Sequence, residues 1–513
     1  MPHINYDVIT NDFIMEGFFS EYLPPSFSLD NSFDPCTVDI AEKAELVSPL
    51  MFTMSRFSED GKRRAIYIPE FSSYLSTVKF MKEKDLVKDI IQESSDDLSF
   101  SPLVQINGDL TRHEQIYNFD FTADEADQES LKSSYIPNIV EKLNRAKGAR
   151  GILSLDISNF YASIYTHLIP SIKIGYENAE MQYKAQKANN ADPCITEEYR
   201  TYANLDQHIR NLNIAKTNGL LPGTLISQFI AEALLSKIDK EIQKHGIQFA
   251  RYVDDYEVFI YNENKINEIQ STITMILNKY SLSLNNEKTK YSAFPYYVVE
   301  NLEEIYKNYS CENPSDADMM KLFNTYFKLE DTGTKGAIRF LVKSISDSFI
   351  PSNNKFLSSY LFNVLANDSR SLVKVCQLLI KRKSEIITDD ADIRLIENLL
   401  NNHLQAGHHL ETVWLLYLRR KITSKEIPAK ILHAVACSDN DLAKIIVIEE
   451  CRKHISEKIK NEIIDGASSW ILCYQLFYND WIRKEQFQDL SHITKNVALY
   501  AKLKRKHFSF YKA

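Results

Sequence analysis

Two adjacent acids, Asp254 and Asp255, stand between two short runs of apolar and aromatic residues, 249–253 and 256–260. Runs of this length and composition predict a β-hairpin whose turn carries both acids. Neighbouring carboxylates repel each other and destabilise a folded chain unless a cation offsets their charge. Divalent metal ions are the usual partners, because hard cations prefer oxygen ligands. The hairpin therefore indicates either a metal site or a polar hairpin tip at the surface, and further acids are needed to decide.

A third acid stands where a strand is expected to end. Residues 151–155 form an apolar run that stops at Asp156. Ser158 or Asn159 can then cap a short helix that contains Tyr161. Taken alone, Asp156 is better interpreted as an ordinary acid at the end of a strand.

A turn rich in glycine and proline, residues 219–223, lies between the two acidic sites. It opens a long amphipathic helix over residues 224–235, and at such a turn the backbone can approach a ligand closely. After the acidic hairpin, a helical stretch leads to residues 284–288, which include Lys288.

Taken in order along the chain, these four segments resemble the palm of reverse transcriptases. Four motifs in the right order and at plausible spacing make an accidental match improbable. The resemblance implies an α+β fold in which reverse-transcriptase-like fingers and palm precede an all-α domain. The matching positions are Asp156 for motif A, residues 219–227 for motif B, 252–255 for motif C and 284–288 for motif D.

Further segments narrow the resemblance to bacterial abortive-infection (Abi-type) reverse transcriptase-like DNA polymerases, a group that includes the one of P2-type prophages. Residues 160–170, 285–295 and 333–338 are similar to that group, and residues 63–69 are similar to its fingers segment. The similarity covers most of residues 50–345 and is more diffuse in the remainder of the chain.

Motif B departs from the pattern of template-copying relatives. Those relatives usually carry Pro-x-Gly, often with Gln before the second glycine, whereas here Pro222 directly precedes Gly223 and Gln is absent. The departure puts in doubt the usual support for a templating base, but it leaves the metal chemistry untouched.

The resemblance implies nucleotidyl transfer at two metal ions about 4 Å apart, one activating a 3′-hydroxyl and one holding the triphosphate. Mg²⁺ suits an all-oxygen site of this kind, with Mn²⁺ as an alternative. Asp156 and Asp254 would bridge both metals, and Asp255 would lie near the metal on the hydroxyl side. The carbonyl of Ile157 would complete the shell of the nucleotide-bound metal.

The remaining site residues are expected to contact nucleotide or primer. An aromatic ring at Tyr161 would block a ribose 2′-hydroxyl and favour dNTPs; the alternative is a core aromatic. Arginine forks suit phosphate oxygens, although one of the two arginines is expected to be only a surface charge. The expected nucleotide-binding residues are Arg63, Arg64, Tyr161, Gly223 and Lys288, and the expected primer contact is Tyr252.

Composition excludes several other classes of protein. No apolar run approaches the roughly 20 residues of a membrane span, and the N-terminus lacks the features of a signal peptide, so a cytoplasmic protein without a membrane is expected. Seven cysteines without a Cys-x-x-Cys pair predict reduced thiols, and neither a disulfide frame nor a zinc site. A net charge of −9 is unusual for a protein that grips long duplexes. It indicates a narrow basic channel or little duplex to hold.

Three domains are expected along the 513 residues. Residues 1–145 would form an N-terminal arm and fingers, and residues 146–310 the palm, with a linker near Cys311. Residues 311–513 would form an α-helical, solenoid-like domain, because helical patterns recur in pairs every 35 to 40 residues, as in HEAT-like repeats. The expected pairs are 316–328 with 335–349, 354–366 with 370–382, 390–404 with 409–421, and 427–436 with 440–454.

Three functions remain open on this basis. The first is a phage-defence DNA polymerase that joins dNTPs without a template and starts from a hydroxyl of its own protein. Its product would be single-stranded DNA, either free or attached to the protein, with Tyr6 and Tyr22 as candidate acceptors and a homo-oligomer as the expected assembly. The second is an RNA-templated reverse transcriptase acting in defence. The third is a non-catalytic helical binding protein with a relic palm, which the retention of all three acids disfavours.

Overall fold

A computed structural model describes most of the chain. The described residues are 5–29, 46–55, 62–94, 99–100, 103, 136–297, 302–309, 314–345, 349–386, 389–452, 455–493 and 495–512. The linker expected near Cys311 lies outside them.

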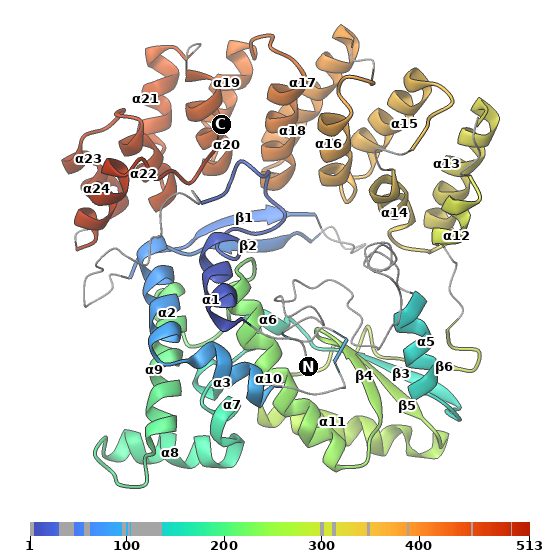
Figure 1. The fold of residues 1–513 in the computed structure, drawn as a ribbon, viewed down its shortest axis with the longest axis vertical. Helices are drawn as coiled ribbons and strands as arrows, with labels where there is room; N and C mark the ends of the chain where they lie inside the picture. Colours follow the sequence, from blue (N-terminus) through green and yellow to red (C-terminus); the bar gives the residue numbers. More distant parts are fainter. Residues whose placement is uncertain are drawn as a thin grey trace. The chain divides into compact units, whose positions relative to one another are not determined.

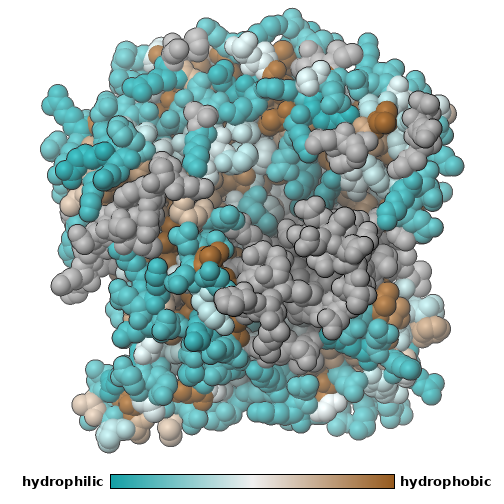
Figure 2. Space-filling model, viewed as in Figure 1, coloured by the Kyte–Doolittle hydropathy of each residue, from teal (hydrophilic) through white to brown (hydrophobic). Residues whose placement is uncertain are grey.

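The chain forms two compact units, and each is assembled from several stretches of sequence. Unit 1 comprises Met1–Phe18, Asp34–Pro49 and Ile68–Val299, and unit 2 comprises Phe19–Phe33, Leu50–Tyr67 and Glu300–Ala513. No described helix combines the length and the apolar character that a membrane crossing requires. On the face drawn in Figure 2, hydrophilic residues predominate and apolar ones are scattered.

Unit 1 contains a four-stranded antiparallel sheet in the order β4-β5-β3-β6, which is drawn on the right in Figure 1. Strand β3 is buried on both faces. Ile152 packs with Phe100 and Phe259 on one face, whereas Leu153 and Leu155, one residue out of phase, point to the other. The strands are β3 (Gly151–Asp156), β4 (Phe249–Tyr252), β5 (Asp255–Ile260) and β6 (Lys290–Ala293).

The long helix of unit 1 is α10 (Leu225–Lys244). Most of its residues are buried, because apolar side chains occupy nearly all of its sides. It begins at Thr224, whose side chain accepts a hydrogen bond from the Ser227 N–H. The chain after α1 runs against this start. A Cβ on Gly17 would lie 2.6 Å from the Leu225 Cβ, and the Leu225 N–H donates to the Gly17 carbonyl. Only glycine fits there.

The other helices of unit 1 surround the sheet and α10 (Figure 1). They are α1 (Tyr6–Met15), α2 (Phe71–Glu83), α3 (Leu86–Glu93), α5 (Ile136–Arg145), α6 (Phe160–Ser163), η2 (Thr166–Leu168), α7 (Ser171–Ile174), α8 (Tyr176–Ala188), α9 (Glu197–Leu212), η3 (Glu263–Lys265) and α11 (Ile266–Lys279).

Unit 2 is built from helices that pack as successive neighbours (Figure 1). Helices α14, α16, α18, α20 and α22 contact one another in that order, and α17, α19 and α21 form a second row. The four expected helix pairs are confirmed, while the HEAT-like class stays a prediction. The helices are α12 (Leu302–Lys307), α13 (Asp316–Asp331), α14 (Ala337–Ser344), α15 (Asn354–Asn367), α16 (Leu372–Lys381), α17 (Asp390–Gln405), α18 (His409–Ile422), α19 (Ala429–Ala436), α20 (Asp441–Glu450), α21 (Glu457–Asp465), α22 (Trp470–Tyr478), α23 (Lys484–Ser491) and α24 (Val497–Arg505).

Two N-terminal stretches complete unit 2. Strands β1 (Leu50–Met54) and β2 (Arg64–Ile68) form a two-stranded sheet, and β1 packs against α18. The indole Nε1–H of Trp414, buried in α18, donates to the Tyr22 carbonyl at 2.7 Å. Residues 1–145 are therefore divided between the two units, and their expected division into arm and fingers stays a prediction.

Candidate active site

The β4–β5 hairpin carries two of the three expected acids on or beside its turn. Tyr252 pairs with Asp255, so that Val253 and Asp254 alone form the turn. Val253 adopts a left-handed backbone with φ of +54°, a conformation that β-branched residues rarely adopt and that costs about 1–3 kcal/mol. The turn therefore needs support from its surroundings.

Arg251 supplies that support from beneath the turn. Its guanidinium is fully buried, and Nη1 donates to the Val253 carbonyl at 2.9 Å. The same group meets both oxygens of Glu232 on α10, at 2.9 and 2.7 Å, and Nε donates to Asp239 Oδ2 at 2.7 Å. The Tyr256 hydroxyl donates to the other oxygen of Asp239 at 2.9 Å. A charged cluster thus fixes the hairpin to α10.

The register of the sheet places Asp156 directly opposite Asp255. Asp156 is 6 % exposed. Its carboxylate accepts hydrogen bonds from Lys288 Nζ at 2.6 Å and from Asn285 Nδ2 at 3.2 Å. Desolvation, followed by the negative charges of Asp254 and Asp156, raises the pKa of Asp255 to about 7, although Lys288 acts to lower it. The three acids therefore form a crowded group, and Lys288 offsets part of its charge through Asp156.

This crowding has a consequence for stability that varies with pH. Because the folded protein raises the pKa of Asp255 from its ordinary 3.8 to about 7, the folded state binds more protons than the unfolded state in that window, and stability falls as pH rises through it. Asp255→Asn should therefore raise the free energy of unfolding at pH 8 by about 1 kcal/mol, a value reduced for solvent screening because the side chain is exposed.

The gain should vanish below pH 4, where both states are protonated. Urea denaturation with chelator present, at pH 4 and pH 8, measures it. Glu268→Gln, which changes an exposed acid of α11, is the matched control and should show no such pH dependence. Equal effects of Asp255→Asn at both pH values would contradict the crowding.

The donor set fits a hard divalent cation. Asp156 and Asp255 are directly opposite each other in the sheet, and Asp254 precedes Asp255 on the turn. Burial and then the charges of Asp254 and Asp156 raise the pKa of Asp255, and a metal ion would relieve that repulsion. The backbone of Ile157 is fixed beside them, since its N–H donates to the Asp254 carbonyl at 3.2 Å. Asp156, Ile157, Asp254 and Asp255 thus lie together at one end of the sheet. Their role as metal ligands stays a prediction.

The glycine–proline turn of the expected motif B contacts the helix that follows the expected motif A, also within unit 1. The Leu220 N–H donates to the Tyr161 carbonyl at 2.8 Å, which seats the glycine–proline turn on α6. Gly219 has φ of +93°, and a Cβ there would lie 3.3 Å from the Ala162 backbone, so a larger residue would push the turn away. Gly223 has φ of +117° and immediately precedes Thr224, the N-cap of α10.

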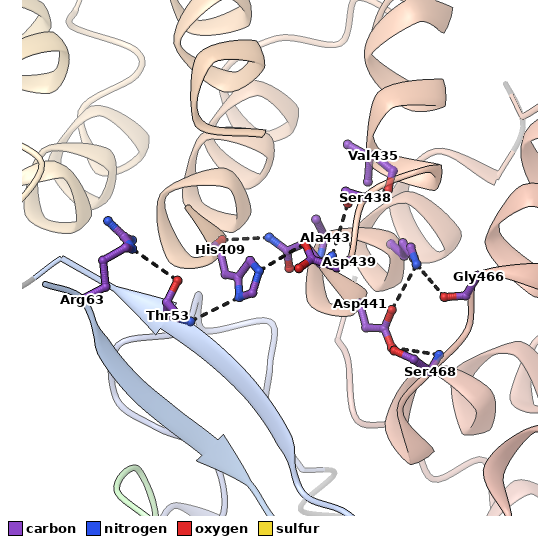
Figure 3. Close-up of polar contacts among 12 residues, drawn as sticks. Thr53, Arg63, His409, Val435, Ser438, Asp439, Asp441, Ala443, Gly466 and Ser468 are labelled. Carbon is purple, nitrogen blue, oxygen red and sulfur yellow. Dashed lines mark hydrogen bonds and ion pairs between the residues drawn. The ribbon is translucent and has the colours of Figure 1, made fainter. Parts of the chain in front are cut away.

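Two of the residues expected to bind nucleotide belong to unit 2 and are described there. Arg63 and Arg64 belong to unit 2. The Arg63 guanidinium pairs with Glu411 of α18, and Nε donates to Thr53 Oγ1 at 3.2 Å. Figure 3 shows Thr53 on β1 and Arg63 just before β2, and the Thr53 N–H donates to His409 Nδ1. Their role as a triphosphate clamp stays a prediction, and the site described above is built from unit 1 alone.

Two contributors to the site were not singled out from the sequence. Asn285 lies within the expected motif D, and its amide binds Asp156. Arg251 precedes the hairpin, and the signal that points to it is Glu232, a lone acid within the apolar run 229–235 that needs a buried cation.

A family model covers the part of the chain that holds these motifs. Residues 105–311 match the model of reverse transcriptase (RNA-dependent DNA polymerase). The chain carries a reverse transcriptase-like domain. The expected bounds of the palm and the assignment to the abortive-infection group stay predictions.

A relative and two solved structures are also similar to parts of the chain. Retron Ec48 reverse transcriptase from Escherichia coli is 24% identical over 151 residues, which are 28% of this chain and 31% of that protein. The match therefore spans less than a third of the relative's length.

The solved structures are telomerases bound to the TWJ fragment of telomeric RNA. The one from Candida albicans is 13% identical, with 73% of this chain and 62% of that chain covered and a TM-score of 0.27. The one from Candida tropicalis is 10% identical, with 84% and 65% covered and a TM-score of 0.30. Less than two thirds of either telomerase chain is spanned, and at these scores neither informs the geometry of the site.

Proposed function

We propose that this chain is a DNA polymerase related to reverse transcriptases, which joins dNTPs by two-metal nucleotidyl transfer. The observation that carries the proposal is the placement of Asp156 opposite Asp255, with Asp254 on the adjoining turn. Like charges directly opposite each other in a sheet are destabilising. An arrangement of this kind is expected where a bound cation compensates for the cost.

The chain's own residues have distinct tasks in this proposal. Asp156, Asp254 and Asp255 would hold Mg²⁺ or Mn²⁺, which supplies activation of the attacking hydroxyl and charge stabilisation at the triphosphate. Lys288, now paired with Asp156, would exchange that partner for the departing pyrophosphate once a metal binds the carboxylate. Tyr252 would contact the primer, and Arg251 would keep the turn in place.

Sugar selection should depend on Tyr161. Its side chain is half-buried on α6, so the ring is held by the protein and yet accessible. Tyr161→Val should raise incorporation of NTPs relative to dNTPs by roughly 10- to 100-fold, because steric exclusion of one hydroxyl is worth on the order of 1–3 kcal/mol. Tyr161→Phe keeps the ring and should retain the preference. Competition assays with labelled dNTP and NTP measure the ratio, and an unchanged ratio in Tyr161→Val would refute the gate.

Template independence and protein priming belong to the same proposal. They are supported by the altered motif B at Pro222-Gly223, by the net charge of −9 and by the resemblance to abortive-infection polymerases. The proposed role in phage defence rests on that resemblance alone. Tyr6 begins α1 in unit 1, whereas Tyr22 is held in unit 2, where burial raises its pKa. Both residues stay candidate acceptors of the first nucleotide. The expected homo-oligomer stays a prediction.

The alternative is an RNA-templated reverse transcriptase, and one experiment separates the two. Purified protein is incubated with labelled dNTP and Mg²⁺ without nucleic acid and then run on a denaturing gel. Label that migrates with the boiled polypeptide and disappears in Asp254→Ala supports protein priming, and its loss in Tyr6→Phe would identify the acceptor. Label that requires an added template and primer would move the assignment to reverse transcription.

A further inference from the structure

A histidine, a cysteine and a glutamate lie close together on α19 and α21, in the second row of helices of unit 2. Among the residues that the structure describes, His433, Cys437 and Glu462 form a set whose ligand atoms all lie within 4.8 Å of one another. The sequence contains no Cys-x-x-Cys pair that would indicate this set, because its members come from two different helices. None of these residues takes part in the polymerase site proposed above.

The backbone brings the three side chains together. His433 and Cys437 are four residues apart, at the end of α19, and the Cys437 N–H donates to the His433 carbonyl at 3.0 Å. This helical bond places both side chains on one face. Glu462 lies on α21, which packs against α19. Buried Val435 and Ile463 belong to these two helices, so the ligands stand on a fixed scaffold.

Both partners of the histidine meet the same ring nitrogen. Glu462 Oε2 lies 2.7 Å and Cys437 Sγ 3.8 Å from His433 Nδ1. A nucleophile–histidine–acid relay requires the two partners on opposite nitrogens, because the imidazole passes a proton from one to the other. Convergence on one nitrogen is instead what a shared metal ion requires.

One of the two distances to His433 Nδ1 is close to that in a tetrahedral zinc site, and the other must lengthen. Zinc binds sulfur at about 2.3 Å and nitrogen or oxygen at about 2.0–2.2 Å, so a tetrahedral site separates its ligand atoms by about 3.4–3.6 Å. The Cys437–His433 separation of 3.8 Å is close to that value. The His433–Glu462 pair must open from 2.7 Å, which is feasible because their side chains are 47% and 22% exposed.

We propose that His433, Cys437 and Glu462 bind a divalent transition-metal ion, Zn²⁺ by its preference for thiolate and imidazole, with water in the fourth position. Thiolate excludes the hard cations Mg²⁺ and Ca²⁺ as preferred occupants. The ion would join α19 to α21 and stabilise the folded unit 2, since it binds the assembled helices and has no preformed site in the unfolded chain.

Cobalt substitution of the full-length protein tests the proposal. Co²⁺ is titrated into reduced, metal-free protein with excess Mg²⁺ present to occupy oxygen sites. We expect one equivalent to produce a thiolate-to-cobalt charge-transfer band and the intense visible bands of a tetrahedral ion. Cys437→Ser should abolish the charge-transfer band, and His433→Ala or Glu462→Gln should weaken affinity by at least about 100-fold, more than loss of a ligand's hydrogen-bond partner does. Added Zn²⁺ should displace the cobalt and raise the melting temperature of the wild type.

The matched control is Cys194→Ser, which removes the other exposed thiol among the described cysteines and should leave the bands intact. All these variants alter partly or fully exposed side chains, so circular dichroism should show an unchanged fold. Absence of the charge-transfer band in the wild type, or its persistence in Cys437→Ser, would overturn the proposal. Neither outcome depends on polymerase activity.

Discussion

Asp156→Asn is expected to lower the rate of dNTP incorporation by at least about 10³-fold, because loss of one metal-binding carboxylate removes several kcal/mol of transition-state stabilisation. The fold should survive. Asparagine matches aspartate in shape, its amide oxygen can still accept a hydrogen bond from Lys288, and removal of one charge relieves the repulsion from Asp255. Initial rates at saturating Mg²⁺, together with the free energy of unfolding, separate the two effects.

Glu268→Gln is the control for this experiment, because it removes an exposed acid from the same unit, away from the hairpin. It should leave the rate unchanged. Wild-type incorporation by Asp156→Asn would reject the metal assignment. A loss of rate that accompanies unfolding would mean that Asp156 is chiefly structural.

Arg251→Met is expected to lower the free energy of unfolding by about 3–5 kcal/mol, which is the usual cost of leaving buried charges without their partner. Glu232 and Asp239 would lose a cation that is fully enclosed, and the Val253 carbonyl would lose its donor. Arg251→Lys should recover only part of the loss, since an ammonium cannot reproduce the bidentate fork. Urea denaturation monitored by far-ultraviolet circular dichroism measures the change in the free energy of unfolding.

Arg150→Met alters an exposed arginine next to β3 and should shift stability by no more than about 0.5 kcal/mol. The sharper test adds Glu232→Gln and Asp239→Asn to Arg251→Met, which removes the stranded charges and should restore part of the stability. If Arg251→Met were as benign as Arg150→Met, the cluster would not support the hairpin.

Local patterns sufficed to predict much of the catalytic end of the sheet. The strand that ends at Asp156, the hairpin around Asp254 and the helix pairs of the C-terminal half all follow from short-range alternation of apolar and polar residues. Which acid of the hairpin faces Asp156 could not be predicted in this way. That choice follows from a two-residue turn and its register, and apolar runs of similar composition permit more than one register.

Long-range pairing accounts for what else the sequence did not reveal. Arg251 meets Asp239 and Glu232, 12 and 19 residues away, on a helix whose other residues indicate only an apolar core. Arg63 resembles part of a fingers segment, yet its guanidinium pairs with Glu411, 348 residues further on. The contact between Glu462 and His433 likewise joins residues that are 29 positions apart. Such contacts depend on packing that periodicity does not encode.

Unit 2 combines N-terminal and C-terminal parts of the sequence, and this affects how it can fold during synthesis. The hydrogen bond from the Thr53 N–H on β1 to His409 can form only after His409, 356 residues further along the chain, has been synthesised. At a translation rate of roughly 5–20 residues per second, about 20–70 s pass before the partner is made. During that interval the β1–β2 sheet has no helical row to pack against, and its strand edges are open to other chains. A cell that makes this protein must therefore protect an early segment until a late one arrives, and faster synthesis would shorten the period of exposure.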